Sequence, residues 1–222
     1  PLVPPLARDA TTFGGSVDGR WLAFGDRHGS THLVDMHTHI THHLQGHQQG
    51  ITDIQFRDDT LATASADGTV RIWRLPPHEA TVLRTSQESV FTLAFDKNHH
   101  RLFADGQSGS LRSWDLADGG TPPERRLLDH GATAFGLQLS PSGRFVVSPG
   151  WSGRVFVWDV DAGACIRTLR HTGIARGVAI SPDERTLVSV GSDGTMWIAD
   201  LQTDSPARSL QLGRGLWRAT FT

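Results

Sequence analysis

The chain has 222 residues, enough for one sizeable domain or two small ones, so length alone does not fix the domain count. With 21 basic and 23 acidic residues its formal net charge is −2, which gives no reason to expect broad attraction to nucleic acid or membranes. The single cysteine, Cys165, excludes an intrachain disulfide, and we expect it to be buried in a protein of a reducing, cytoplasmic compartment. No apolar run approaches the roughly 20 residues of a membrane span.

Short strand-like runs follow one another along the whole chain. In them apolar, β-branched and aromatic residues alternate with polar ones, and turns rich in Gly, Asp, Ser or Pro separate them. In chain order the clearest runs are 21–24, 70–73, 111–114, 155–158 and 187–190. No window carries a sustained apolar stripe at the helical period of 3.6 residues. The sequence therefore predicts an all-β protein.

These runs recur at a nearly constant interval. Aligning the residues near their ends gives one column, formed by Val34, Trp73, Trp114, Trp158 and Ala199. The intervals within the column are 39, 41, 44 and 41 residues, the period of a four-stranded propeller blade. An aspartate follows the column residue in four of the five repeats, as Asp35, Asp115, Asp159 and Asp200.

The column and its surroundings resemble the WD-repeat family over essentially the whole chain. Gly46-His47 is similar to the family's Gly-His step, 140–144 and 181–185 to its first turn, and 66–70 and 192–196 to its second. The resemblance implies a β-propeller segment of five repeats, at about 1–37, 38–75, 79–116, 124–160 and 165–201, with part of a further blade at 208–222.

The ends of the sequence suggest an excised piece. Pro1 opens it without a start methionine or signal-peptide pattern, and the last repeat breaks off at Thr222. A propeller closes into a ring to remove its sheet edges. We therefore expect part of a longer chain whose ring has six or seven blades. The near absence of lysine, with Lys97 alone, favours a bacterial source.

The second repeat is the best preserved. The resemblance places a buried hydrogen-bonded chain on His47, Ser65, Asp67 and Trp73. Such groups must satisfy one another, because an unmade buried hydrogen bond costs about 1–3 kcal/mol. Other repeats keep only parts of it: His130 and Trp158 in the fourth, and His171 and Asp193 in the fifth, where Gly191 and Ala199 do not complete it.

The resemblance also implies that a partner binds on the face around the central channel. Two positions in each repeat point to that face, and the partner-binding residues they predict are Trp151, Phe91, Phe135, Arg176, Trp217, Gln107 and Arg27. Exposed aromatic side chains with an arginine are typical of interface hot spots. For Phe91 and Phe135 a core position at the start of their strands is an equal alternative. Trp151, in a Gly-Trp-Ser-Gly turn, is the sharpest candidate.

Other functions find less support. The histidine-rich segment 28–47 contains His37 and His39, which would share one face of a strand at a feasible metal-ligand spacing. No third ligand is evident, however, and a polar outer strand is the favoured explanation. No nucleophile elbow or phosphate-binding glycine loop appears, so we expect no catalytic residues and no cofactor. The small arginine clusters are balanced by acids. We expect a non-catalytic scaffold or sensor module that binds a protein or peptide rather than nucleic acid or membrane. The alternative is a propeller enzyme or metal-binding propeller, with its site in the channel or in 28–47.

Overall fold

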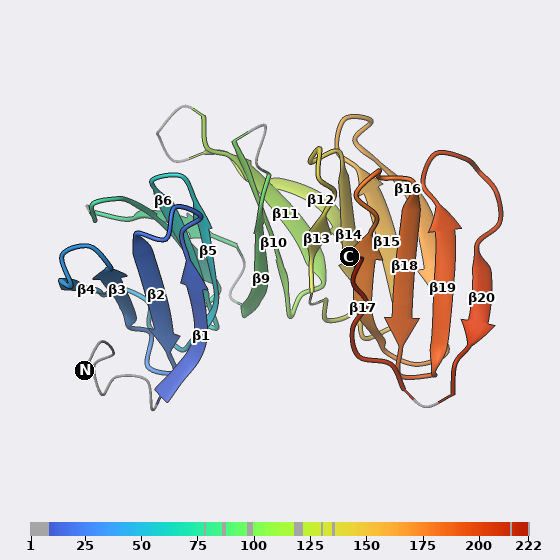
Figure 1. Ribbon diagram of the computed structural model, residues 1–222, viewed down its shortest axis with the longest axis horizontal. Coiled ribbons are helices and arrows are strands. Elements are labelled where there is room, and N and C mark those ends of the chain that lie inside the picture. The colour runs from blue at the N-terminus through green and yellow to red at the C-terminus, as the bar shows by residue number, and fades with distance from the viewer. Residues whose placement is uncertain are drawn as a thin grey trace.

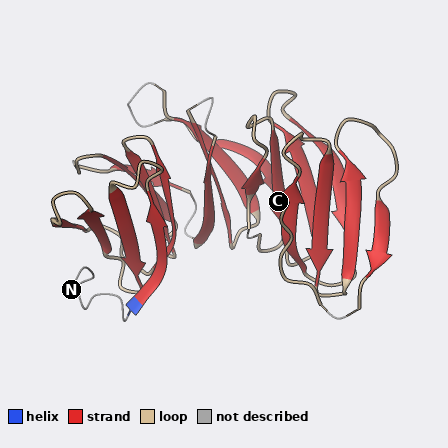
Figure 2. Ribbon diagram, viewed as in Figure 1, coloured by secondary structure: helices blue, strands red, loops and turns tan. Residues whose placement is uncertain are grey.

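The computed structural model describes residues 9–77, 79–85, 88–96, 100–117, 122–129, 131–134, 136–213 and 215–221. Within these residues the regular structure consists of β-strands, apart from a 3-10 turn at Asp9 that Figure 2 draws in blue, and no α-helix is present, as the sequence predicted. No helix formed by the described residues is long and apolar enough to cross a membrane.

The described residues form twenty strands in five antiparallel sheets, each built from four strands that are consecutive in the sequence (Figure 1). Blade 1 contains β1 (Ala10–Gly15), β2 (Trp21–Asp26), β3 (Thr31–Asp35) and β4 (Thr41–Leu44). Blade 2 contains β5 (Ile51–Arg57), β6 (Thr60–Ser65), β7 (Thr69–Arg74) and β8 (Thr81–Arg84). Blade 3 contains β9 (Val90–Phe95), β10 (Arg101–Gly106), β11 (Ser110–Asp115) and β12 (Arg125–Asp129). Blade 4 contains β13 (Gln138–Leu139), β14 (Phe145–Pro149), β15 (Arg154–Asp159) and β16 (Ala164–Arg170). Blade 5 contains β17 (Ala175–Ile180), β18 (Thr186–Gly191), β19 (Thr195–Asp200) and β20 (Arg208–Gln211).

The blades stand side by side in chain order, with the first strand of each beside the first strand of the next. Blades 1 and 5 lie at opposite ends of this row (Figure 1). Apolar side chains fill the space between neighbours: Leu61 and Trp73 of blade 2 pack with Ala23 and Leu33 of blade 1, all of them buried. Burying one face of each sheet against the next stabilises the row, because a fully buried aliphatic side chain contributes about 1.5–3 kcal/mol.

Residues 215–221 lie where the first strand of a sixth blade would begin. The N–H of Leu216 donates to the carbonyl of Gly191 over 2.9 Å, as Ala134 does to Gly106 two blades earlier over 3.0 Å. The segment passes so close to β17 that a Cβ on Gly177 would come within 2.9 Å of the Arg218 Cα. The structure thus confirms five blades plus part of another. Leu2-Val3, an apolar pair whose sequence also suggests an outer strand, lies outside the described residues.

The sheets are offset from the sequence repeats by one strand. The repeat at 38–75 begins with β4, the outermost strand of blade 1, and then runs through β5, β6 and β7 of blade 2. Each blade therefore receives its fourth strand from the beginning of the following repeat.

Four of the five third strands end in an aspartate, and in blades 1 and 4 its side chain closes a tight turn. Oδ1 of Asp35 accepts the backbone N–H groups of His37 and Thr38 over 2.8 and 3.2 Å. Asp159 makes the same pair of bonds over 3.0 and 2.9 Å. An aspartate side chain that accepts such N–H groups favours a turn over a continued strand.

This turn overturns one expectation. His37 and His39 do not share the face of a strand: both lie exposed in the turn that Asp35 closes, with His39 at a φ of 60°. The expectation of a buried Cys165 is wrong as well. Cys165 is exposed on β16, the outer strand of blade 4, where one neighbouring strand is absent and solvent takes its place.

Candidate binding face

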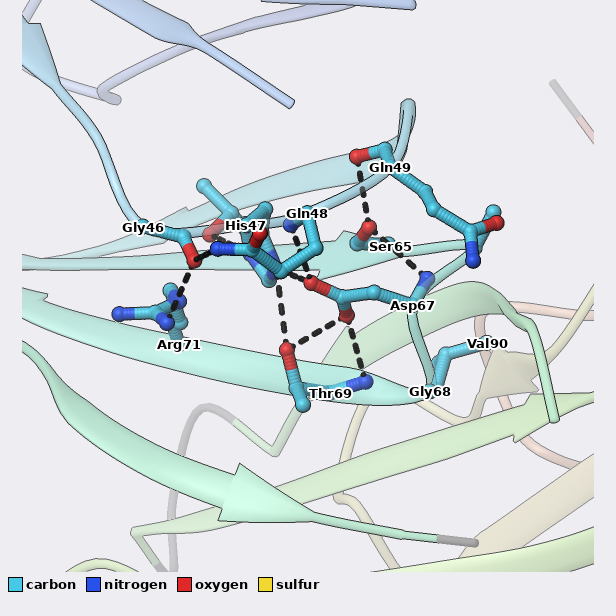
Figure 3. Close-up of polar contacts among 12 residues, drawn as sticks. Gly46, His47, Gln48, Gln49, Ser65, Asp67, Gly68, Thr69, Arg71 and Val90 are labelled. Atoms are coloured by element: carbon cyan, nitrogen blue, oxygen red, sulfur yellow. Dashed lines mark hydrogen bonds and ion pairs between the residues drawn. The ribbon is translucent and has the colours of Figure 1, made fainter. Parts of the chain in front are cut away.

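At one edge of the blades the first strands begin and turns join the second and third strands; we call this edge the candidate face. In blade 5 it is the lower edge in Figure 1, where the arrow of β18 ends. The side chains of the second blade that organise this edge are shown in Figure 3.

A hydrogen-bonded chain fastens the loop before β5 to the interior of blade 2. Nδ1 of His47 lies 3.0 Å from Oδ2 of Asp67, which also accepts the N–H of Gln48 over 2.8 Å (Figure 3). On the other side of the ring, Nε2 of His47 lies 2.9 Å from Oγ1 of Thr63. The indole N–H of Trp73 donates to the same hydroxyl over 3.2 Å. The chain therefore runs from Asp67 through His47 and Thr63 to Trp73.

Ser65 is not a link in this chain, contrary to the prediction. Its hydroxyl donates to the carbonyl of Gln49 over 2.9 Å and accepts the N–H of Asp67 over 3.1 Å, so it braces the same turn from the backbone side (Figure 3). Thr63 and Ser65 stand two positions apart on β6, so both side chains project from the same face of the strand. Thr63 is the one that lies between His47 and the indole.

Burial and partners fix the charges of the chain. Burial lowers the pKa of His47, and the attraction of Asp67 opposes that effect. Burial acts to raise the pKa of Asp67, but hydrogen bonds from the Thr69 hydroxyl, the Gln48 N–H and the Thr69 N–H lower it below its usual range. A neutral imidazole with its proton on Nδ1 satisfies all these contacts, since Nε2 is then free to accept from Thr63.

Blade 5 carries a shorter version. His171 lies 3.1 Å through Nδ1 from Asp193 and 2.7 Å through Nε2 from the hydroxyl of Ser189. Burial acts to raise the pKa of Asp193, but hydrogen bonds from the N–H groups of Thr195 and Thr172 and from His171 lower it to about 2. The hydroxyl in this chain comes from Ser189, two residues before Gly191, so Gly191 takes no part in it. Ala199 ends it without an indole.

The interface of blades 3 and 4 holds a buried carboxyl group that was not predicted. Oδ2 of Asp105 accepts the hydroxyl of Ser148 over 3.1 Å, whereas its buried Oδ1 has no hydrogen-bond partner among the described residues. Burial raises the pKa of Asp105 to about 7; hydrogen bonds from Ser148 and Thr92 oppose the shift, and the nearby carboxyl of Asp53 adds to it. An aspartate inside the apolar strand 101–106 was the signal that could have found it.

Three predicted binding residues occupy equivalent places on the candidate face. The backbone N–H groups of Arg27, Gln107 and Trp151 each donate to a carbonyl in the segment before a first strand, over 3.3, 2.9 and 2.9 Å. All three residues are exposed, and Trp151 has 57% of its surface in solvent. The Arg27 guanidinium also pairs with Asp9 over 2.9 Å.

The predicted binding residues near the starts of the first strands differ in how exposed they are. Phe91 is half-buried on β9, whereas Trp217 is 72% exposed. The half-buried Arg176 lies over the Trp217 ring, with its Cζ 3.5 Å from the ring centroid. Phe135 and His130 lie outside the described residues.

The described residues contain no cluster of three or more His, Cys, Asp or Glu side chains that could hold a metal ion. The histidines that do meet are His32 and His43, on neighbouring strands of blade 1, with their Nδ1 atoms 3.0 Å apart. The predicted pair His37 and His39 takes no part in this contact.

Comparisons with known proteins agree with the fold. The family model described as "WD domain, G-beta repeat" matches residues 38–74, 122–159 and 163–200, which is just over half of the chain. Striatin-4 of Homo sapiens is 26% identical over 56% of this chain, transducin beta-like protein 3 of Mus musculus 31% over 75%, and coronin-7 of Rattus norvegicus 34% over 47%. The matched parts make up 20%, 22% and 12% of those relatives' own lengths.

A solved structure shows the same architecture. The crystal structure of the computationally designed Ika8 protein matches with a TM-score of 0.81 and 24% identity, covering 96% of this chain and 65% of that one. At this identity the likeness concerns the fold alone. With the repeat period, the five four-stranded blades and the family model in agreement, the chain belongs to the WD-repeat family.

Proposed function

We propose that this chain is a non-catalytic binding module, the scaffold or sensor part of a larger protein, and that it holds a protein or peptide on the candidate face. WD-repeat proteins generally bind protein partners, which supports the class of partner. The free, exposed thiol of Cys165 supports a location in a reducing compartment such as the cytoplasm.

The observation that carries the proposal is the exposure of Trp151 and Trp217 on one face. Large aromatic side chains contribute most to binding when a partner buries them. The backbone N–H of Trp151 donates to the carbonyl of Thr133, so the backbone of this turn is fixed before a partner binds.

The test is a quantitative pull-down with the full-length protein that contains this segment, followed by identification of the captured proteins. We expect Trp151→Ala to release a partner while changing the free energy of unfolding by less than about 0.5 kcal/mol, as exposed positions usually do. Ile40→Ala is the matched control, because Ile40 is 54% exposed in the turn after β3, away from the candidate face. Partner release by both variants alike, or a large loss of stability with Trp151→Ala, would contradict the proposal.

A further inference from the structure

Arg176 on the candidate face is held in place but has no acidic partner. Its guanidinium stacks on the exposed Trp217 ring, and its buried Nε makes no hydrogen bond with the described residues. None of the ion pairs formed among those residues includes Arg176. A guanidinium stacked on a ring can still use its terminal N–H groups, which lie in the plane of the guanidinium, to bind a carboxylate or phosphate as a fork.

The acidic residues that could pair with Arg176 from this face already have other partners. Asp193, in the same blade, accepts His171 and two backbone N–H groups, and Asp67 is similarly bound to His47 in blade 2. Asp9 pairs with Arg27. Glu88 is exposed, but it precedes β9 in blade 3, two blades away from Arg176. The candidate face therefore offers Arg176 no evident carboxylate of its own.

Further arginines end or begin strands at the same edge. Arg84 is paired in register with Thr69, just after the second turn of blade 2, and Arg154 with Arg170 at the corresponding place in blade 4. All three are exposed and take part in no ion pair among the described residues. A chain with a net charge of −2 thus presents unneutralised arginines on the face that also carries its exposed tryptophans.

We propose that the candidate face binds an acidic peptide segment, with one acidic group of the peptide held by the Arg176 fork and an apolar residue packed on Trp217 or Trp151. This inference rests on the proposed function and adds the chemistry of the partner. A peptide fits better than a nucleic acid, because the net negative charge of the chain opposes a long polyanion while a few local arginines attract short acidic segments.

Binding is measured by fluorescence anisotropy on the whole chain with a fluorescein-labelled ten-residue peptide that contains five glutamates and two leucines. A peptide with glutamine in place of glutamate and one with phosphoserine in place of glutamate complete the set. We expect the glutamine peptide to bind at least about tenfold more weakly. Arg176→Gln should weaken binding of the glutamate peptide about tenfold, and Arg176→Lys by several-fold, because lysine keeps the charge but loses the planar stack.

Arg208→Gln is the matched control. Arg208 is an exposed arginine of the same blade, on β20 toward the opposite edge, and its removal should leave the affinity unchanged. Retention of the phosphoserine peptide that also depends on Arg176 would support the proposal and make phosphate a ligand of the same fork. Equal losses with Arg176→Gln and Arg208→Gln would overturn it, as would equal binding of the glutamine peptide.

A single-stranded DNA oligonucleotide of matched charge is the last arm. If it binds more tightly than the glutamate peptide and depends on Arg176, the face belongs to nucleic acid and the proposal fails. If the peptides fail while Trp151→Ala still releases a captured protein, the acidic chemistry is wrong and the binding function stands. If the Trp151 test fails too, the proposed function falls with it.

Discussion

Blades 2 and 3 each bury an ionisable side chain, and they treat it in opposite ways. In blade 2 both ring nitrogens of His47 have partners, and the ring is neutral. In blade 3 only one carboxyl oxygen of Asp105 has a partner among the described residues. The first group completes a chain of polar atoms inside one blade, whereas the second accepts the Ser148 hydroxyl of the next blade and leaves its Oδ1 without a hydrogen-bond partner among the described residues.

Burial disfavours the charged form of both side chains, and its consequences for the pH dependence of stability are opposite because His47 is a base and Asp105 an acid. The folded-state pKa of His47 is lowered, so the stability it supports is present above about pH 6.5 and is lost as the pH falls below that value. The folded-state pKa of Asp105 is raised to about 7. The contribution of its protonated form to the stability of the fold is therefore fully present below about pH 4 and is lost as the pH rises through 7.

The largest expected effect is the loss of the blade 2 chain. His47→Ala removes the partner of Asp67 and of Thr63 at once and should lower the free energy of unfolding by about 3 kcal/mol at pH 7.5, because buried polar groups are left unpaired. Urea unfolding measures it, with the exposed His37→Ala as control. A loss below about 0.5 kcal/mol would show that packing alone holds the blade.

A smaller effect of opposite sign is expected in blade 3. Asp105→Asn removes a carboxylate that has to ionise inside the protein, so it should raise the free energy of unfolding by about 2 kcal/mol at pH 8 and change it little at pH 4. Urea unfolding from pH 4 to 8 tests the slope. If the free energies of unfolding of the wild-type protein and the variant change in parallel across this pH range, Asp105 does not titrate as proposed.

The smallest expected effect separates Thr63 from Ser65. Thr63→Val removes the hydroxyl between His47 and Trp73 and should cost about 1.5 kcal/mol. The NMR signal of the Trp73 indole N–H should move as well, since its acceptor is lost. Ser65→Ala should cost less and leave that signal in place, because Ser65 bonds only to backbone groups. A shifted indole signal in Ser65→Ala alone would restore Ser65 to the chain.

Much of the fold could be predicted because it follows from spacing. Tryptophans 41 and 44 residues apart, each at the end of an alternating apolar run, leave little choice but one four-stranded blade per interval. The histidine–aspartate pairs of blades 2 and 5 could be predicted from the family resemblance, in which Asp67 and Asp193 each stand six residues before the column residue (73 − 67 and 199 − 193).

The errors concern choices that spacing does not decide. Thr63 and Ser65 are both small hydroxyl residues on one face of one strand, and only the position of the histidine ring selects between them. His37 and His39 read as alternating strand residues until the Asp35 side chain is seen to close a turn on them. The unpartnered oxygen of Asp105 depends on which blade packs against β10, and the sequence contains no such contact information.

The one-strand offset between repeats and sheets bears on how proteins of this kind can be shortened or lengthened. A protein ended at Trp73 or Trp158, where a repeat closes, would leave β7 or β15 as a bare edge able to pair with another copy and aggregate. Ends placed in 45–50 or 171–174 keep every sheet at four strands. Duplication of one repeat likewise adds a complete blade only because each new unit gives its first strand backward and receives a fourth from the unit that follows.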